Sequence, residues 1–227
     1  MRNALNVFQE GINEVRKMTI VYDHFVVELN ISHDEVSDIL RAQIVNAVSA
    51  FDRLIHELVN IGVVEVFLGT RIRTSKFLNQ PFKAETLIKS LEFSSPGFIP
   101  ASVNDNPRFL VEKEMREKMS YLAFEAPDKV RDALSYIWDN EHKLLAIAKD
   151  MALSGANDNE KQKNLEQELQ LIVDRRNQIA HEGDIDPMTN TKRSITKDNA
   201  KECVDFLEKT GLSIYRLVTD PSCYIHP

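Results

Sequence analysis

Apolar residues recur at three- and four-residue steps along most of this chain, and that spacing restricts it to packed helices. Side chains three and four positions apart lie on the same face of a helix, so each run forms one apolar stripe. Only 7 Gly and 8 Pro occur among 227 residues, of which 43% are hydrophobic and 28% charged. This composition favours long helices over a sandwich or barrel. We therefore predict an all-α fold in one domain spanning residues 1–227.

The helical spacing divides the chain at turn-forming residues. We expect helices at 5–29, 32–61 (ending near Gly69), 75–92 (one or two short ones), 109–124, 128–153, 160–182 and 196–219, with an irregular stretch at 93–108. Ser32 and Glu35 form a capping box that opens the second helix. Residues 1–31 are expected to form either an N-terminal helical arm or half of a helical hairpin, and 221–227 a loose tail.

The cysteine pattern and the terminal residues favour a cytoplasmic protein. Cys203 and Cys223 have neither a disulfide framework nor a metal-binding spacing around them, so a reducing compartment is expected. Met1–Glu10 lacks the apolar core of a signal peptide. We also expect no association with a membrane, because no stretch is long and apolar enough to cross one.

The predicted helix 160–182 carries a charged residue on its apolar stripe. At about 100° per residue, Arg176 falls between Leu165 and Leu169, in the middle of the apolar arc. A guanidinium is costly to remove from water unless it is paired. Arg176 should therefore face a polar partner or an anion. Asn177 and His181, four apart, share a face beside this stripe. Gly183 is expected to end the helix.

Each of these residues also has an ordinary structural explanation. For Arg176 the alternative is an ion pair with a carboxylate of helix 32–61, for which Asp52 and Glu57 are the candidates. For His181 it is a cap at the end of the helix, where the dipole favours a protonated ring. For Asn177 it is an ordinary surface amide.

Three basic residues around this segment are candidates for holding a phosphate. Arg175 borders the polar face of the helix and is interpreted as a phosphate-steering residue. Lys192 and Arg193 lie in the polar loop beyond His181. They are either ordinary surface charges or further contacts to a nucleic-acid backbone.

Three segments resemble a known family. Arg176-Asn177-x-x-x-His181 resembles the R-x4–6-H signature of the HEPN superfamily, and Ala50–Val59 resembles the first core helix of its RiboL-PSP-HEPN subgroup. Ile195-Thr196-x-x-x-Ala200 is similar to the start of the subgroup's final helix. The resemblance implies a HEPN-like helical bundle with additional helices and metal-independent endoribonuclease activity on RNA. It also implies a homodimer with a composite cleft, and a role in host defence or a toxin–antitoxin system with a cognate antitoxin or defence partner.

In such a ribonuclease, His181 would transfer protons, Arg176 would stabilise the phosphorane, and Asn177 would orient the ring or the phosphate. One histidine is too few to act as acid and base at once, so water or a second subunit would have to contribute. The expected products are a 2′,3′-cyclic phosphate and a 5′-hydroxyl. We expect no metal and no cofactor, because the chain has no His-Glu-x-x-His spacing and no glycine-rich phosphate loop.

The overall charge keeps a second interpretation open. The net charge of −7 and pI near 5.4 count against broad coating of nucleic acid. The rival hypotheses are a non-catalytic HEPN-like interaction or binding module and the immunity partner of a toxin pair. In a binding module, Asp52 or Glu57 should hold Arg176, and His181 should point away.

Overall fold

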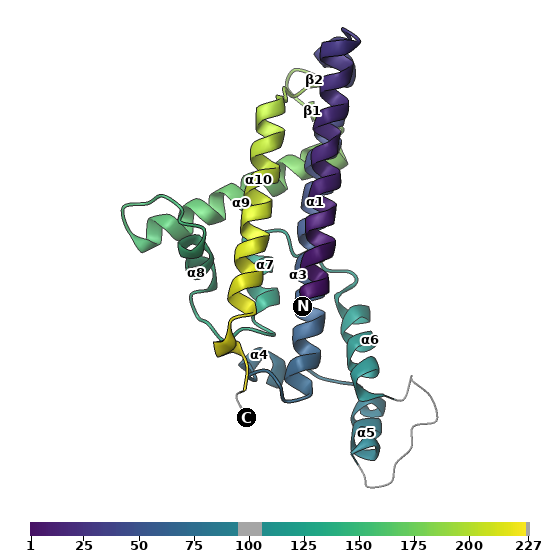
Figure 1. Ribbon diagram of the computed structural model, residues 1–227, viewed down its shortest axis with the longest axis vertical. Helices are drawn as coiled ribbons and strands as arrows, with labels where there is room; N and C mark the ends of the chain where they lie inside the picture. The colour runs from purple at the N-terminus through teal and green to yellow at the C-terminus, as the bar shows by residue number, and fades with distance from the viewer. Residues whose placement is uncertain (95–105, 226–227) are drawn as a thin grey trace.

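Three long helices run along the long axis of the molecule, and a fourth crosses them (Figure 1). This computed structural model describes residues 1–94 and 106–225. Its helices are α1 (Arg2–Asp23), a π-helical turn (His24–Glu28), α2 (His33–Val36), α3 (Asp38–Phe67), α4 (Ser75–Leu78), α5 (Ala84–Phe93), α6 (Pro107–Met119), α7 (Pro127–Leu134), α8 (Lys143–Asp150), α9 (Asp158–Glu182), α10 (Lys197–Val218) and a 3-10 turn (Pro221–Cys223). The predicted all-α class is confirmed.

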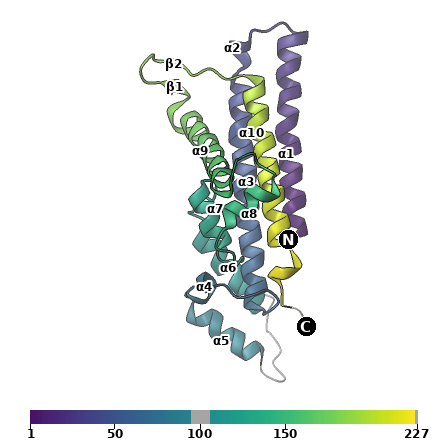
Figure 2. The same ribbon diagram turned by 90° about the vertical axis from the view of Figure 1, so that its left-hand side faces the viewer.

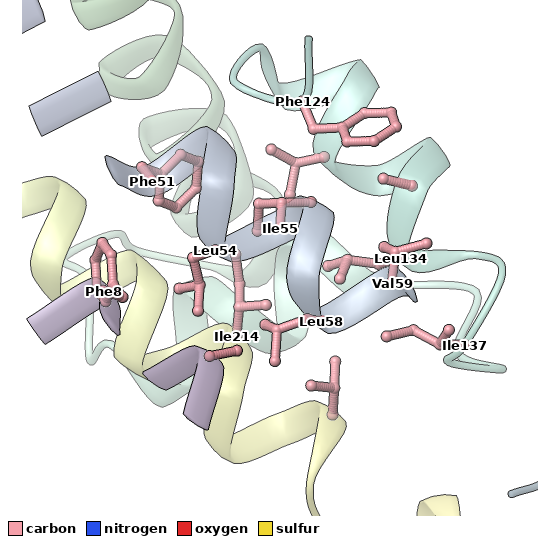
Figure 3. Close-up of a cluster of buried hydrophobic side chains, with 14 of the residues drawn as sticks. Phe8, Phe51, Leu54, Ile55, Leu58, Val59, Phe124, Leu134, Ile137 and Ile214 are labelled. Atoms are coloured by element: carbon pink, nitrogen blue, oxygen red, sulfur yellow. The ribbon is translucent and has the colours of Figure 1, made fainter. Parts of the chain in front are cut away.

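The α3 helix forms the centre of the bundle because it is apolar around most of its circumference. It packs against α1, α6, α7, α9 and α10. Figure 3 shows Phe8 and Ile214 on one side of α3, with Phe124, Leu134 and Ile137 on the other. Helix α1 contributes Phe8 to this core, so residues 1–31 form half of a hairpin with α3 rather than a free arm.

The helix ends follow the predicted signals. Ser32 and Glu35 form the capping box at α2, with the Ser32 Oγ–Glu35 Oε2 hydrogen bond at 2.7 Å. Thr196 accepts a hydrogen bond from the Asn199 amide at the start of α10. At the other end of α9, Gly183 has a φ of 63°, a conformation that glycine adopts without strain.

The region 128–153 departs from the prediction, because α7 and α8 replace one continuous helix. The chain turns between them, which buries Ile137 and Trp138. Asn140 stabilises the turn: its side chain accepts from the His142 amide at 2.7 Å, and its carbonyl accepts from Lys143 Nζ at 2.6 Å. The apolar spacing of α7 and α8 is compatible with one continuous helix, so it does not reveal the turn between them.

Two segments that connect helices complete the description of the fold. The segment after α9 forms an antiparallel hairpin of β1 (Ile185–Asp186) and β2 (Thr191–Lys192) at one end of the molecule (Figure 2). Of the irregular stretch expected at 93–108, residues 95–105 lie outside the described part of the chain, and Phe93 and Pro107–Arg108 are helical. In the described residues, no helix is both long and apolar enough to cross a membrane.

The C-terminal segment is not loose as far as Ile225. Arg71 is fully buried and binds it: Nη1 donates to the Val218 carbonyl at 2.9 Å, and Nη2 donates to the Tyr224 hydroxyl at 2.7 Å. The Ile225 amide donates to the Thr70 carbonyl at 3.2 Å. A buried guanidinium needs such acceptors, so the segment supplies what Arg71 requires. Residues 226–227 lie outside the described part.

A glycine sets the spacing of α1, α3 and α10. A Cβ on Gly211 would lie 2.6 Å from Phe8 Cζ and 2.9 Å from Leu54 Cδ2. We expect Gly211→Ala to lower the free energy of unfolding by about 1–3 kcal/mol through overpacking. Urea denaturation measures this. Gly11→Ala is the matched control, because its Cβ would meet only Ala50 Cβ at 3.4 Å. Equal stability of the two variants would contradict this account of the packing.

Candidate functional site

The last turns of α9 carry Arg176, Asn177 and His181 at the edge of the bundle. The Arg176 side chain is 23% exposed, and His181 is exposed. Arg176 Nη1 donates to Asn177 Oδ1 at 2.9 Å, and Nη2 donates to Glu125 Oε2 at 2.9 Å. Arg176 therefore lies on the apolar face of α9, at the boundary of the core. Its partner is Glu125.

Sequence reasoning missed Glu125, which lies in the loop between α6 and α7. The residue is 6% exposed, and 51 positions separate it from Arg176. Two polar residues of α3 hold this loop in place. Asp52 Oδ1 accepts from the Phe124 amide at 2.5 Å, and His56 Nε2 lies 3.1 Å from the Leu122 carbonyl. Asp52 thus supports the site through the loop. It is not the partner of Arg176, although the sequence offered it as a candidate.

Burial raises the pKa of the Glu125 carboxyl above its ordinary value. The charge of Arg176 lowers that pKa, nearby Asp52 raises it, and His181 lowers it. The net direction is upward, so Glu125 holds a proton more strongly than an exposed glutamate. Carboxyl groups with this property are common where proton transfer takes place, although structural ion pairs also produce it.

Glu57, the other carboxylate considered for Arg176, binds a different helix. Its two oxygens accept from Arg116 of α6 at 2.6 and 2.8 Å. The hydrogen bonds from Arg116 lower the pKa of Glu57. Glu57 therefore joins α3 to α6, and the expectation that it supports Arg176 is not met.

Arg175 contributes to the turn after α9. Asp184 is fully buried, and it accepts from Arg175 Nη2 at 2.8 Å and from Arg41 Nε at 2.5 Å. Arg175 also donates to the Ser194 carbonyl at 3.1 Å. These contacts use the guanidinium inside the protein, so we assign Arg175 to the support of the turn and not to phosphate steering.

Carboxylates likewise pair with the two basic residues of the hairpin. Lys192 Nζ lies 2.7 and 2.8 Å from the oxygens of Asp38, whose pKa this hydrogen bond lowers. Arg193 Nη2 lies 3.2 Å from Glu182 Oε2, and Arg193 Nη1 donates to the Ile185 carbonyl at 2.8 Å. A phosphate would have to compete with these partners, so the expected role of Lys192 and Arg193 in holding RNA has no geometric support.

Within residues 1–94 and 106–225, no three His, Cys, Asp or Glu side chains gather as metal ligands would. Burial raises the pKa of Cys203 to about 11, so this thiol stays protonated near neutral pH and is a poor nucleophile. The groups at the end of α9 that can act chemically are thus a guanidinium, an amide, an imidazole and a carboxyl.

The buried Asp184 pair gives a test of how the turn beyond His181 is held. Asp184→Asn keeps the side-chain size and suits the positive φ of 62°, but it leaves Arg41 and Arg175 without their anion. We expect a loss of about 3 kcal/mol in the free energy of unfolding, measured by urea denaturation. The exposed partner of Lys192 provides the control: Asp38→Asn should cost less than about 1 kcal/mol. Similar losses in both variants would refute the assignment.

The family model described as RiboL-PSP-HEPN matches residues 12–220 of this chain. That range includes α3, α9 and α10, together with the residues at the end of α9 and Glu125. No curated protein and no solved structure significantly matches the chain.

Proposed function

The chain belongs to the RiboL-PSP-HEPN family, and from that membership we propose that it is a metal-independent endoribonuclease. The family assignment supports an RNase-like or nucleotide-binding role. The observation that favours RNA cleavage is that the last turns of α9 carry both a partly exposed arginine and an exposed histidine. We regard residues 1–227 as a single HEPN-like domain.

Arg176 has capacity left to bind a phosphate. A guanidinium has five N–H donors, and Glu125 and Asn177 each occupy one of them. The ion pair with Glu125 holds the group in one orientation at the surface. Preorganised positive charge of this kind stabilises the charge that develops on a phosphorane.

In the proposed reaction the 2′-oxygen attacks the adjacent phosphorus, and the bond to the 5′-oxygen breaks. His181 is exposed, so RNA can approach its ring, which serves in proton transfer. Asn177 keeps its side-chain amide nitrogen for a phosphate oxygen, because its Oδ1 accepts from Arg176. The products are a 2′,3′-cyclic phosphate and a 5′-hydroxyl.

The assembly and setting belong to the same proposal. We propose a homodimer in which the α9 helices of two copies approach each other, as the family resemblance implies. The α9 residue Leu171 is 63% exposed and would suit such a contact. We place the activity in the cytoplasm, in a toxin–antitoxin or host-defence system with a cognate antitoxin or defence partner.

A non-catalytic binding module is the second candidate, and one observation favours it. Glu125 already neutralises Arg176, and carboxylates pair with Arg175, Lys192 and Arg193. The immunity partner of a toxin pair is a related alternative, for which the net charge of −7 would imitate RNA. Cleavage of RNA by the purified protein separates these candidates from the first.

If the first proposal is right, purified protein will cleave total RNA and tRNA in EDTA. His181→Ala and Arg176→Ala should each lower the rate by about 100-fold or more, since they remove proton transfer and charge stabilisation. Asn177→Ala should cause a smaller loss. Gel electrophoresis gives the rates, and ligation before and after cyclic-phosphate opening identifies the ends.

The control is Asp174→Ala, which changes an exposed α9 residue bonded only to Gln170 among the described side chains. It should cleave like the wild type. Loss of activity on chelation and its return with magnesium would contradict the metal-free mechanism. Cleavage that survives in His181→Ala would reveal a contaminating nuclease.

The neutralised basic residues lead to a prediction about salt. Each phosphate contact to single-stranded RNA adds about −0.7 to the slope of log affinity against log salt concentration. With Arg176 as the main contact, we expect a slope near −0.7, measured by filter binding with His181→Ala protein. A slope of about −3 would mean that Arg175, Lys192 and Arg193 leave their carboxylates to bind RNA.

A further inference from the structure

The proposed cleavage requires two proton transfers at opposite ends of the reaction. The 2′-hydroxyl must lose a proton as it attacks, and the 5′-oxygen must gain one as it leaves. A single imidazole cannot be deprotonated to accept the first proton and at the same time protonated to donate the second. The reaction at Arg176 therefore calls for a second proton-transfer group.

Glu125 lies next to the guanidinium that would bind the phosphate. Its Oε2 accepts from Arg176 Nη2 at 2.9 Å, and its side chain is 7% exposed. Among the described residues, Arg176 is its one hydrogen-bonding partner. No described residue donates to Oε1, and this atom is not completely enclosed by the protein.

The neighbouring carboxylates are bound more fully. Asp184 is clamped by two arginines, and both oxygens of Glu57 accept from Arg116. Asp52 Oδ1 holds the Phe124 amide, while its Oδ2 lies 3.6 Å from His56 Nε2. Glu125 differs from Asp184 and Glu57 because only one of its oxygens accepts a hydrogen bond from a described residue, and it differs from Asp52 because it contacts Arg176.

The surroundings of Glu125 also suit a base. Burial raises its pKa, Arg176 and His181 of α9 oppose that rise, and Asp52 of α3 adds to it. A carboxylate with proton affinity above the ordinary value accepts a proton from a hydroxyl more readily at neutral pH.

We propose that Glu125 is the general base of the reaction and that His181 is its general acid. This inference rests on the proposed ribonuclease function. The Glu125 carboxylate takes the 2′-hydroxyl proton as the 2′-oxygen bonds to phosphorus. The bond from phosphorus to the 5′-oxygen breaks, and the protonated ring of His181 gives that oxygen its proton. Exchange with water then deprotonates Glu125 and reprotonates His181.

With Glu125 as the base and His181 as the acid, both proton-transfer groups belong to one protomer. Arg176 contacts the base on one side and the phosphate on the other, so the ion pair aligns the carboxylate with the reacting phosphorus. A second copy is then not needed to complete the acid–base pair. A dimer would instead shape the surface that receives RNA.

Glu125→Gln tests the role, because the amide oxygen can still accept from Arg176 but cannot take a proton. We expect kcat/KM for RNA to fall about 100- to 10,000-fold in EDTA. The variant should remain folded by circular dichroism and should bind 2′-O-methyl RNA at least as tightly as the wild type, because Arg176 loses its neutralising charge. Glu57→Gln, the same change in the pair with Arg116, should cleave normally. Near wild-type cleavage by Glu125→Gln would reduce Glu125 to a positioning residue and overturn the proposal.

A substrate with sulfur in place of the 5′-oxygen separates the base from the acid, because a thiolate leaves without protonation. His181→Ala should regain most of its activity on this substrate, and Glu125→Gln should not. Rescue of Glu125→Gln would overturn the assignment. Wild-type protein that cleaves no RNA would overturn the ribonuclease function as well, whereas active wild type with active Glu125→Gln would overturn only this inference.

The pH dependence gives an independent readout. Glu125 must be ionised to act, so kcat/KM of the wild type should fall as the pH drops through its raised pKa. The charged groups near Glu125 that shift this pKa are Asp52, Arg176 and His181. Glu125→Gln should lack the limb, with its residual rate independent of pH there. An acidic limb unchanged in Glu125→Gln would contradict a base role for this carboxyl.

Discussion

The burial of α3 is the constraint on which the rest of the structure depends. A helix that is apolar around most of its surface must be covered on several sides, and α1, α6, α7, α9 and α10 provide that cover. Its polar residues then fix the loops between the covering helices. Arg41 holds the turn at Asp184, and Asp52 holds the loop at Phe124. The turn after α9 and the loop that carries Glu125 are thus anchored to one helix.

Carboxylates neutralise the arginines at the end of α9. Arginines at the end of α9 each have a carboxylate: Asp184 for Arg175 and Glu125 for Arg176. The two arginines are similarly exposed, at 20% and 23%, and the pairs differ in how fully they are bonded. Asp184 also accepts from Arg41, and Arg175 also donates to the Ser194 carbonyl, so this pair supports the turn after α9. Among the described residues, Glu125 is bonded by Arg176 alone, so we assign the contact with a ligand to this second pair. Adjacent residues of one signature have in this way taken separate roles.

Local features could be predicted from the sequence, and long-range partners could not. Helix spacing, the Ser32 capping box and the Gly183 helix end depend on residues within a few positions, so pattern reasoning found them. The same reasoning placed Arg176 correctly at a polar boundary. It chose the wrong partner, since nothing in the spacing connects Arg176 with Glu125 in a loop 51 positions earlier. The one signal in the sequence is a glutamate two positions before the proline that begins α7.

The most direct test of the central claim is a crystal structure with an RNA whose 2′-hydroxyl is methylated at the cleavage site. We expect the scissile phosphate to bind Arg176, with the 2′-oxygen beside Glu125 Oε1 and the 5′-oxygen beside the ring of His181. The opposite result is RNA bound elsewhere, with His181 turned away from it and Arg176 still bonded only to Glu125 and Asn177. That result would identify a binding module.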